Sequence, residues 1–87
     1  MKIIMSPRAE KQLRKLPKFE QIAVAQKIRS FLHATIQNQE KLRGYKDIFR
    51  VRVGDYRIVF RRSRVEIYIV LIRHRREVYR MLKEILD

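Results

Sequence analysis

The chain has 87 residues, and 22 lysines and arginines against 9 acidic residues give it a formal net charge of +13. This length allows one small domain with one modest core, and a hydrophobic content of 46% argues against disorder. With no cysteine and only two histidines, disulfide frameworks, thiolate metal sites and recognisable zinc ligand sets are excluded, so we expect no metal and no cofactor. The charge calls for an anionic partner, and the 14 arginines favour nucleic acid.

No targeting segment or membrane span is predicted. The apolar run at residues 1–5 is too short for a signal peptide. The longest apolar stretch, Ile67 to Ile72, is far shorter than the roughly 20 residues that cross a bilayer. We therefore expect a cytoplasmic protein that does not associate with membranes.

The first half of the chain predicts one short strand and a helical hairpin. Lys2 to Met5 form the strand, and Ser6-Pro7 is typical of a helix start, with serine as the N-cap. Pro17 ends the first helix, and a second begins at Lys18. Apolar residues follow at helical spacing, in the first helix at Ala9, Leu13 and Leu16, and in the second at Val24, Ile28, Phe31, Leu32 and Thr35.

After Gly44 the apolar period changes from helical to alternating. The pattern predicts strands at 49–53, 56–61 and 65–71, with turns at Gly54-Asp55 and at Arg62-Ser63 or Ser63-Arg64. The apolar face of the last strand would carry Val65, Ile67, Ile69 and Leu71. Residues 76–87 return to helical spacing. The order β-α-α-β-β-β-α predicts an α+β domain, in which an N-terminal helical hairpin packs on a twisted antiparallel sheet of about four strands and a C-terminal helix follows.

The Gly54-Asp55 turn fixes the register of its hairpin. It places Val53 opposite Tyr56, and Arg52 opposite Arg57. One face then carries the core residues Phe49, Val51, Val53, Tyr56, Ile58 and Phe60, and the other carries Arg50, Arg52, Arg57, Val59 and Arg61. A plain solvated surface is the alternative, but clustered arginines of one sign favour an anion-binding face, near which only Asp55 and Glu66 supply acids.

Aromatic residues and a histidine are expected near this face. If Arg62-Ser63 is the turn, Tyr68 lies opposite Arg57, an arrangement that suits stacked bases. His74 alternates to the same face as Tyr68 and is interpreted as a phosphate contact, with direct catalysis as the alternative. Glu66 could pair with Arg61. Tyr79 flanks the apolar stripe of the last helix, either as a core residue or as a ring at the rim of the basic face.

Two stretches resemble a known family. Residues 41–60 combine a Leu-x-Gly step with alternating apolar residues and arginines and then Gly-Asp-Tyr-Arg, and residues 72–79 end in His-Arg-Arg-Glu-Val-Tyr. With the element order, they resemble the RelE/ParE superfamily of toxins from type II toxin–antitoxin systems. The resemblance covers nearly the whole chain and implies one toxin domain spanning residues 1–87.

RelE-like members of that superfamily are ribosome-dependent endonucleases that cut mRNA in the A site, whereas ParE-like members poison DNA gyrase and lack the nuclease residues. By resemblance, Arg57 and Arg75 match phosphate-binding arginines, and Tyr79 matches a tyrosine that stacks on the substrate base. The implied catalytic residues are Arg50, Arg52, Arg57, Arg75 and Tyr79, and the candidate RNA-binding residues are Arg43, Lys46, Arg61, Tyr68, His74 and Arg76. These matches favour the RelE-like activity, with a ParE-like gyrase inhibitor or a non-catalytic nucleic-acid-binding domain as alternatives.

The implied reaction is metal-independent cleavage of mRNA through its own 2′-OH, with guanidinium groups stabilising the charge that develops on the phosphate. Arg50 and Arg52 stand where relatives usually have lysine. Because a guanidinium is a far poorer base than an amine, the identity of the general base stays open. The implied partners are the 70S-type ribosome with its mRNA, and an acidic antitoxin with which the toxin forms a hetero-oligomer.

Overall fold

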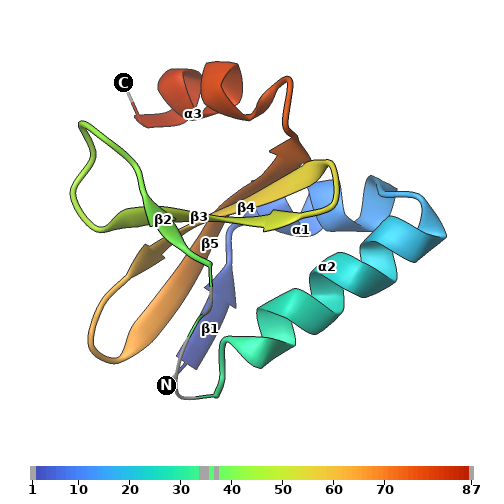
Figure 1. Cartoon of the computed structure of the whole chain (residues 1–87), viewed down its shortest axis with the longest axis horizontal. Helices are drawn as coiled ribbons and strands as arrows, with labels where there is room; N and C mark the ends of the chain where they lie inside the picture. The colour runs from blue at the N-terminus through green and yellow to red at the C-terminus, as the bar shows by residue number, and fades with distance from the viewer. Residues whose placement is uncertain (1, 34–35, 37, 87) are drawn as a thin grey trace.

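The computed structural model describes residues 2–33, 36 and 38–86, and these residues form three helices and one five-stranded sheet (Figure 1). Thr35, expected on the second helix, lies outside the described residues. In chain order the elements are β1 (Lys2–Met5), α1 (Pro7–Lys15), α2 (Lys18–Ser30), β2 (Glu40–Lys41), β3 (Ile48–Val53), β4 (Tyr56–Arg62), β5 (Glu66–His74) and α3 (Val78–Leu86). The α+β class and the element order are confirmed, with one strand more than expected.

The helical hairpin begins and breaks where the sequence indicates. The side chain of Ser6 caps α1 by accepting a hydrogen bond from the Ala9 N–H at 2.9 Å, and Pro7 occupies the first turn. Pro17 separates α1 from α2, since proline cannot continue the hydrogen-bond ladder of a helix.

The strand order is β1-β5-β4-β3-β2, and the β3–β4 hairpin has the predicted register. Val53 pairs with Tyr56, and Arg52 pairs with Arg57. The expectation of an all-antiparallel sheet is wrong, because β1 pairs with β5 in parallel. The meander of β3, β4 and β5 ends with β5 beside β1 and running in the same direction, and the alternating pattern of a short strand carries no information about direction.

A β-bulge in β5 changes which residues face which side. Val59 pairs with Leu71 but Phe60 pairs with Ile69, so Val70 is an extra residue on β5. The single apolar face expected for this strand is therefore wrong: Ile67, Ile69 and Ile72 belong to one core cluster, and Leu71 belongs to the other.

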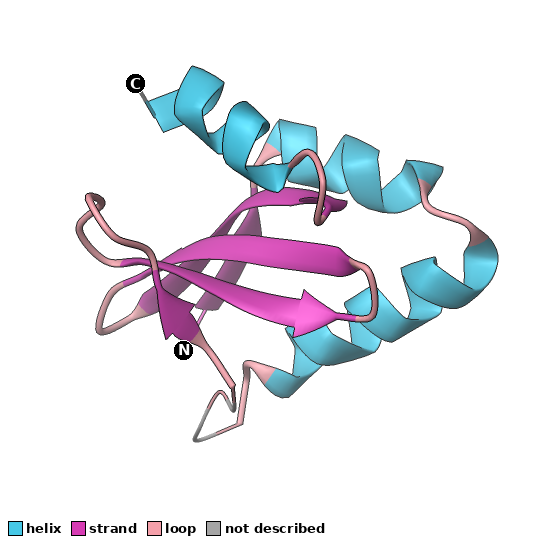
Figure 2. Ribbon diagram, turned by 45° about the horizontal axis from the view of Figure 1, so that its top comes forward, coloured by secondary structure: helices cyan, strands magenta, loops and turns pink. Residues whose placement is uncertain are grey.

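The sheet is covered on both faces (Figure 2). The predicted core face of the β3–β4 hairpin packs against Ala9 of α1, against Val24 and Ile28 of α2, and against Phe31, which directly follows α2. The opposite face was expected to carry the arginine cluster together with Val59, and there the structure adds a second core. Val59 and Leu71 are buried with Val78 and Leu82 of α3. The arginines occupy only the part of this face that α3 leaves open.

The last helix begins at Val78 rather than at Arg76. The backbone N–H of Arg75 bonds to the Asp55 carbonyl at 2.8 Å, and that of Arg76 bonds to Nδ1 of His74 at 3.2 Å. These bonds hold residues 75–77 in a turn, which links the end of β5 to the β3–β4 turn.

Candidate active site

A cavity of about 200 Å³ opens on the sheet face that carries α3. Among the described residues, its lining consists of the predicted arginines Arg50, Arg52 and Arg57 together with Asn38 and Glu40. The hairpin register brings the arginines together, because Arg52 lies directly opposite Arg57 and Arg50 is two residues along the same strand. The sequence therefore predicted the basic part of this cavity, which we call the arginine cavity.

The β3–β4 turn holds two of these arginines. The Gly54 carbonyl accepts hydrogen bonds from Nε of Arg52 at 3.1 Å and from Nη1 of Arg57 at 3.2 Å. The same Arg57 nitrogen also donates to the Tyr56 carbonyl at 3.1 Å. Gly54 has a φ of +60°, a conformation that suits glycine in a two-residue hairpin turn. The turn thus fixes the direction of both guanidinium groups.

Arg75 lies in the turn that follows β5, beside the arginine cavity, and its positive charge acts on Arg57. Its backbone bonds to the Asp55 carbonyl, and its Nε lies 4.0 Å from the Asp55 carboxylate. The side chain is exposed, so this ion pair is open to water and to exchange with another anion.

The charges in the arginine cavity repel one another. The pKa of Arg57 is lowered from its ordinary value, first by burial and then by the positive charges of Arg52, Arg50 and Arg75, while Asp55 acts in the opposite direction. A lowered pKa means that the folded protein holds this proton at a cost in free energy. An anion such as a phosphate group would remove that cost.

Glu40 is an acidic residue of the site that the sequence reasoning missed. Its Oε2 accepts hydrogen bonds from Nε of Arg50 at 3.1 Å and from Nη2 of Arg50. The expected acid, Glu66, forms no ion pair with Arg61 among the described residues. Glu40 lies in β2, which pairs with β3 and sets Glu40 directly opposite Arg50. A two-residue strand gives almost no periodic signal, so only the pairing of β2 with β3 reveals this contact.

A second cavity, of about 280 Å³, adjoins the arginine cavity and shares Glu40 and Arg50 with it. We call it the tyrosine cavity, because its remaining lining includes Tyr45 and Tyr79 together with Lys41, Leu42, Arg43 and Leu82. The Arg50 guanidinium carbon lies 5.4 Å from the centre of the Tyr79 ring. Tyr79 is 52% exposed, so it is the ring at the rim of the basic face rather than a core residue.

Other predicted site residues lie elsewhere. Tyr68 pairs with Arg61, not with Arg57, because the turn between β4 and β5 is longer than the expected two-residue turn and its first pair is Arg62 with Ile67. Tyr68 packs against the second core cluster, and Arg61 is exposed two strand positions beyond the buried Val59. Lys46 is exposed in the turn that precedes β3.

The placement of His74 is also corrected. It pairs with Tyr56, whose ring centre lies 5.6 Å from the imidazole, and so it lies on the face of the helical hairpin. Arg73 lies opposite Arg57, because the bulge shifts the alternation of β5 by one residue beyond Val70. The neighbouring Arg76 is exposed, and its side chain lines none of the cavities described above.

Within the part of the chain that the structure describes, no group of three or more histidine, aspartate or glutamate side chains is placed to hold a metal ion. No helix among residues 2–33 and 38–86 is long and apolar enough to cross a membrane.

The fold and the site together define a small basic α+β domain of the RelE-like fold, as comparison with three solved structures shows. RelE in the RelB–RelE antitoxin–toxin complex of Methanococcus jannaschii superimposes with a TM-score of 0.76 at 21% identity, over 90% of this chain and 96% of that chain. The toxin–antitoxin complex RelBE2 of Mycobacterium tuberculosis gives 0.71 at 23% identity, over 84% and 88%. The isolated E. coli RelE toxin gives 0.69 at 23% identity, over 98% and 97%. At such identities the likeness establishes the fold alone.

The family follows from the sequence itself. Residues 3–79 match the model of the ParE toxin of type II toxin–antitoxin systems, so the chain belongs to that family, within the RelE/ParE superfamily. No curated protein matches the sequence. The protein is thus a toxin of a type II toxin–antitoxin system.

Proposed function

We propose that this toxin is a ribosome-dependent endoribonuclease that cleaves mRNA in the A site and so inhibits translation. The observation that carries the proposal is the pair of adjoining cavities, of which one gathers three arginines and the other presents the Tyr79 ring. An RNA strand needs both features side by side, because a phosphate and the base of the same nucleotide must be held together.

The arginine cavity suits a phosphate that gains negative charge during reaction. Arg52 and Arg57 are fixed by the Gly54 carbonyl before any ligand arrives. Preorganised donors of this kind stabilise a transition state without reorganising, which is often the largest catalytic contribution. Arg75 would complete the set once a phosphate replaces Asp55 as its partner.

Glu40 is the group that we propose as acceptor for the proton of the attacking 2′-OH. A carboxylate can accept a proton at neutral pH, whereas a guanidinium cannot. Glu40 is the only acid among the described residues that line the two cavities, and it lies where they meet. We therefore assign Glu40 as general base, positioned by Arg50.

The products follow from the proton balance. The 2′-oxygen bonds to phosphorus, the bond from phosphorus to the 5′-oxygen breaks, and a 2′,3′-cyclic phosphate remains. The leaving 5′-oxygen would take its proton from a guanidinium beside the scissile phosphate, for which Arg75 and Arg57 are the candidates. Since the nucleophile belongs to the RNA, no metal-bound water is required. Tyr79 would stack on the base and align the 2′-OH.

The partners follow from the same surface. The ribosome would present the mRNA in its A site and supply orientation, and Arg43 of the tyrosine cavity would contact the strand. Lys46, Arg61, Tyr68, His74 and Arg76 remain proposed as peripheral RNA contacts, outside the two cavities. Because two of the fold relatives are toxin–antitoxin complexes, we include an acidic antitoxin that forms a hetero-oligomer with this toxin in the cytoplasm.

The deciding experiment programmes 70S ribosomes with a defined mRNA, adds the purified toxin and maps the 5′ ends by primer extension. We expect a cut in the A-site codon with wild type and none with Arg57→Gln. Arg29→Gln, which removes an exposed arginine on α2, serves as the matched control and should cut like wild type. Intact mRNA with every protein would contradict the proposal.

A gyrase inhibitor without nuclease activity is the second candidate, and the match of residues 3–79 to the ParE family favours it. A supercoiling assay with purified gyrase separates the two. Inhibited supercoiling together with intact A-site mRNA would establish this second activity in place of the first.

A further inference from the structure

Helix α2 carries apolar residues on two sides, and only one side is covered. Val24 and Ile28 are buried against the sheet. On the other side, Phe19 is 87% exposed and Ile22 is 47% exposed. A large aromatic side chain that is almost fully in water is unfavourable for the free protein, and it is common where a partner binds.

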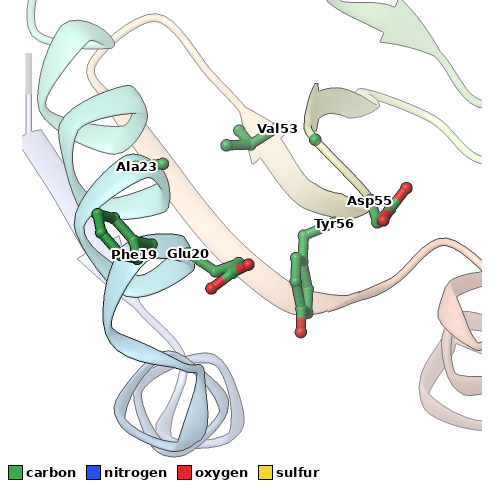
Figure 3. A pocket seen from close by; sticks show the side chains of 7 residues that line it. Phe19, Glu20, Ala23, Val53, Asp55 and Tyr56 are labelled. Atoms are coloured by element: carbon green, nitrogen blue, oxygen red, sulfur yellow. The ribbon is translucent and has the colours of Figure 1, made fainter.

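Phe19 forms one wall of a groove of about 430 Å³ between the start of α2 and the β3–β4 turn (Figure 3). Ala23, Val53 and Tyr56 supply the other apolar side chains. Glu20 extends from α2 toward the strand side of the groove, and Asp55 lies on the opposite rim (Figure 3). The groove is thus apolar inside and acidic at its edges.

The lining of this groove contrasts with the rest of the surface. The chain has 22 lysines and arginines and only 9 acids, yet the described lining contains two carboxylates and neither lysine nor arginine. An occupant that fits such a lining has apolar side chains for Phe19, Val53 and Tyr56 and a positive charge for Glu20, since the Asp55 carboxylate already lies 4.0 Å from Nε of Arg75. Nucleic acid and acidic peptides do not fit, because their charges have the wrong sign for this groove.

We propose that the groove binds an apolar peptide segment carrying a lysine or arginine, contributed by a partner protein. Phe19 supplies the contact area, and Glu20 selects the cation and sets the register of the segment. The proposal goes beyond the endonuclease activity and does not rest on it, since no described residue lines both this groove and a cavity of the active site.

The test uses the full-length toxin and two short helical peptides that differ at one position. Both present a leucine face; one carries a lysine beside it and the other a glutamate. Isothermal titration measures their affinity, and amide chemical shifts locate them. We expect the lysine peptide to bind with shifts at Val53 and Tyr56, and to lose about tenfold or more in affinity with Phe19→Ser. Val65→Ser, at an exposed valine of the β4–β5 turn, should bind like wild type.

A charge swap makes the test specific. Glu20→Lys should lose the lysine peptide and gain the glutamate peptide in the same groove, whereas Glu84→Lys on α3 should change neither. Phe19 and Glu20 lie on the surface, so these variants should fold.

Three results would overturn the proposal. The first is a lysine peptide that causes no shifts in the groove, and the second is equal binding of both peptides there. The third is a toxin dimer that Phe19→Ser converts to monomer, because a second copy of the chain would then be the occupant.

Discussion

Glu40 separates the two tasks of the proposed site, binding and proton transfer. Its carboxylate contacts Arg50, so it competes with a phosphate for that guanidinium, and it also supplies the proton acceptor. In Glu40→Gln the side chain keeps its shape and an oxygen acceptor but loses its charge and its basicity. We expect RNA affinity to stay equal or rise while single-turnover cleavage on programmed ribosomes falls by about 100-fold or more.

Glu66→Gln is the matched control for this variant, because Glu66 lies at the start of β5 and lines neither cavity. It should cleave at the wild-type rate. Cleavage by Glu40→Gln at an undiminished rate would remove Glu40 from the reaction and leave the proton with the ribosome.

Arg57 links the site to stability. Since its pKa is lowered on folding, the cost of holding its proton is present at every pH below that lowered pKa, and it disappears only as the pH rises from that value to the ordinary pKa of an arginine. This group therefore gives no slope of stability against pH around neutrality, and the kind of anion in solution is the variable that tests it. We expect the Tm to rise more with phosphate than with chloride at equal ionic strength.

The double variant Arg52→Gln, Arg57→Gln checks this expectation by calorimetry. Its Tm should respond equally to the two salts, because the preorganised anion site is gone. An unchanged preference for phosphate in the double variant would place the bound anion elsewhere on the surface.

At the scale of elements, the β5 bulge is held by two buried side chains of the first helix and its cap. Ser6 Oγ donates to the Val70 carbonyl at 2.9 Å, and Gln12 Oε1 accepts from the Ile72 N–H at 2.9 Å. Gln12→Ala leaves that buried N–H without a partner, which should lower the free energy of unfolding by about 1–3 kcal/mol in urea titration. Gln26→Ala, on the exposed side of α2, should change it by less than about 0.5 kcal/mol.

The same bulge marks the limit of what the sequence could predict. The β3–β4 hairpin was predictable to the residue, because a two-residue turn and strict alternation fix each pair from Val53–Tyr56 to Arg50–Val59. Four consecutive buried residues, Ile69 to Ile72, hide the extra residue, and so the face of His74 was predicted wrongly. Tyr68 precedes the bulge and lies on the predicted face, opposite Arg61 rather than Arg57. Glu40 and the parallel β1 depend on contacts between distant segments, which local periodicity does not encode.

At the scale of the whole molecule, the fold sorts a large uniform charge into distinct surfaces. The sheet separates the arginine cavity on the side of α3 from the helical hairpin on the other side. Many of the 22 cations therefore lie far from the proposed site, as Arg29 on α2 does. Net charge attracts RNA over long range, but only the arginines of the cavity are placed to contact the same phosphates.

The salt dependence of RNA binding distinguishes these two contributions. Each phosphate contact to single-stranded RNA adds about 0.7 to the slope of log K against log salt concentration, because one bound counterion is released. We expect Arg57→Gln to reduce the slope by about that amount and Arg29→Gln to leave it unchanged, as measured by anisotropy of a labelled oligonucleotide over a sodium chloride series. Equal reductions in the two variants would mean that RNA responds to the diffuse charge of the whole surface, and the arginine cavity would then lose its special role in binding.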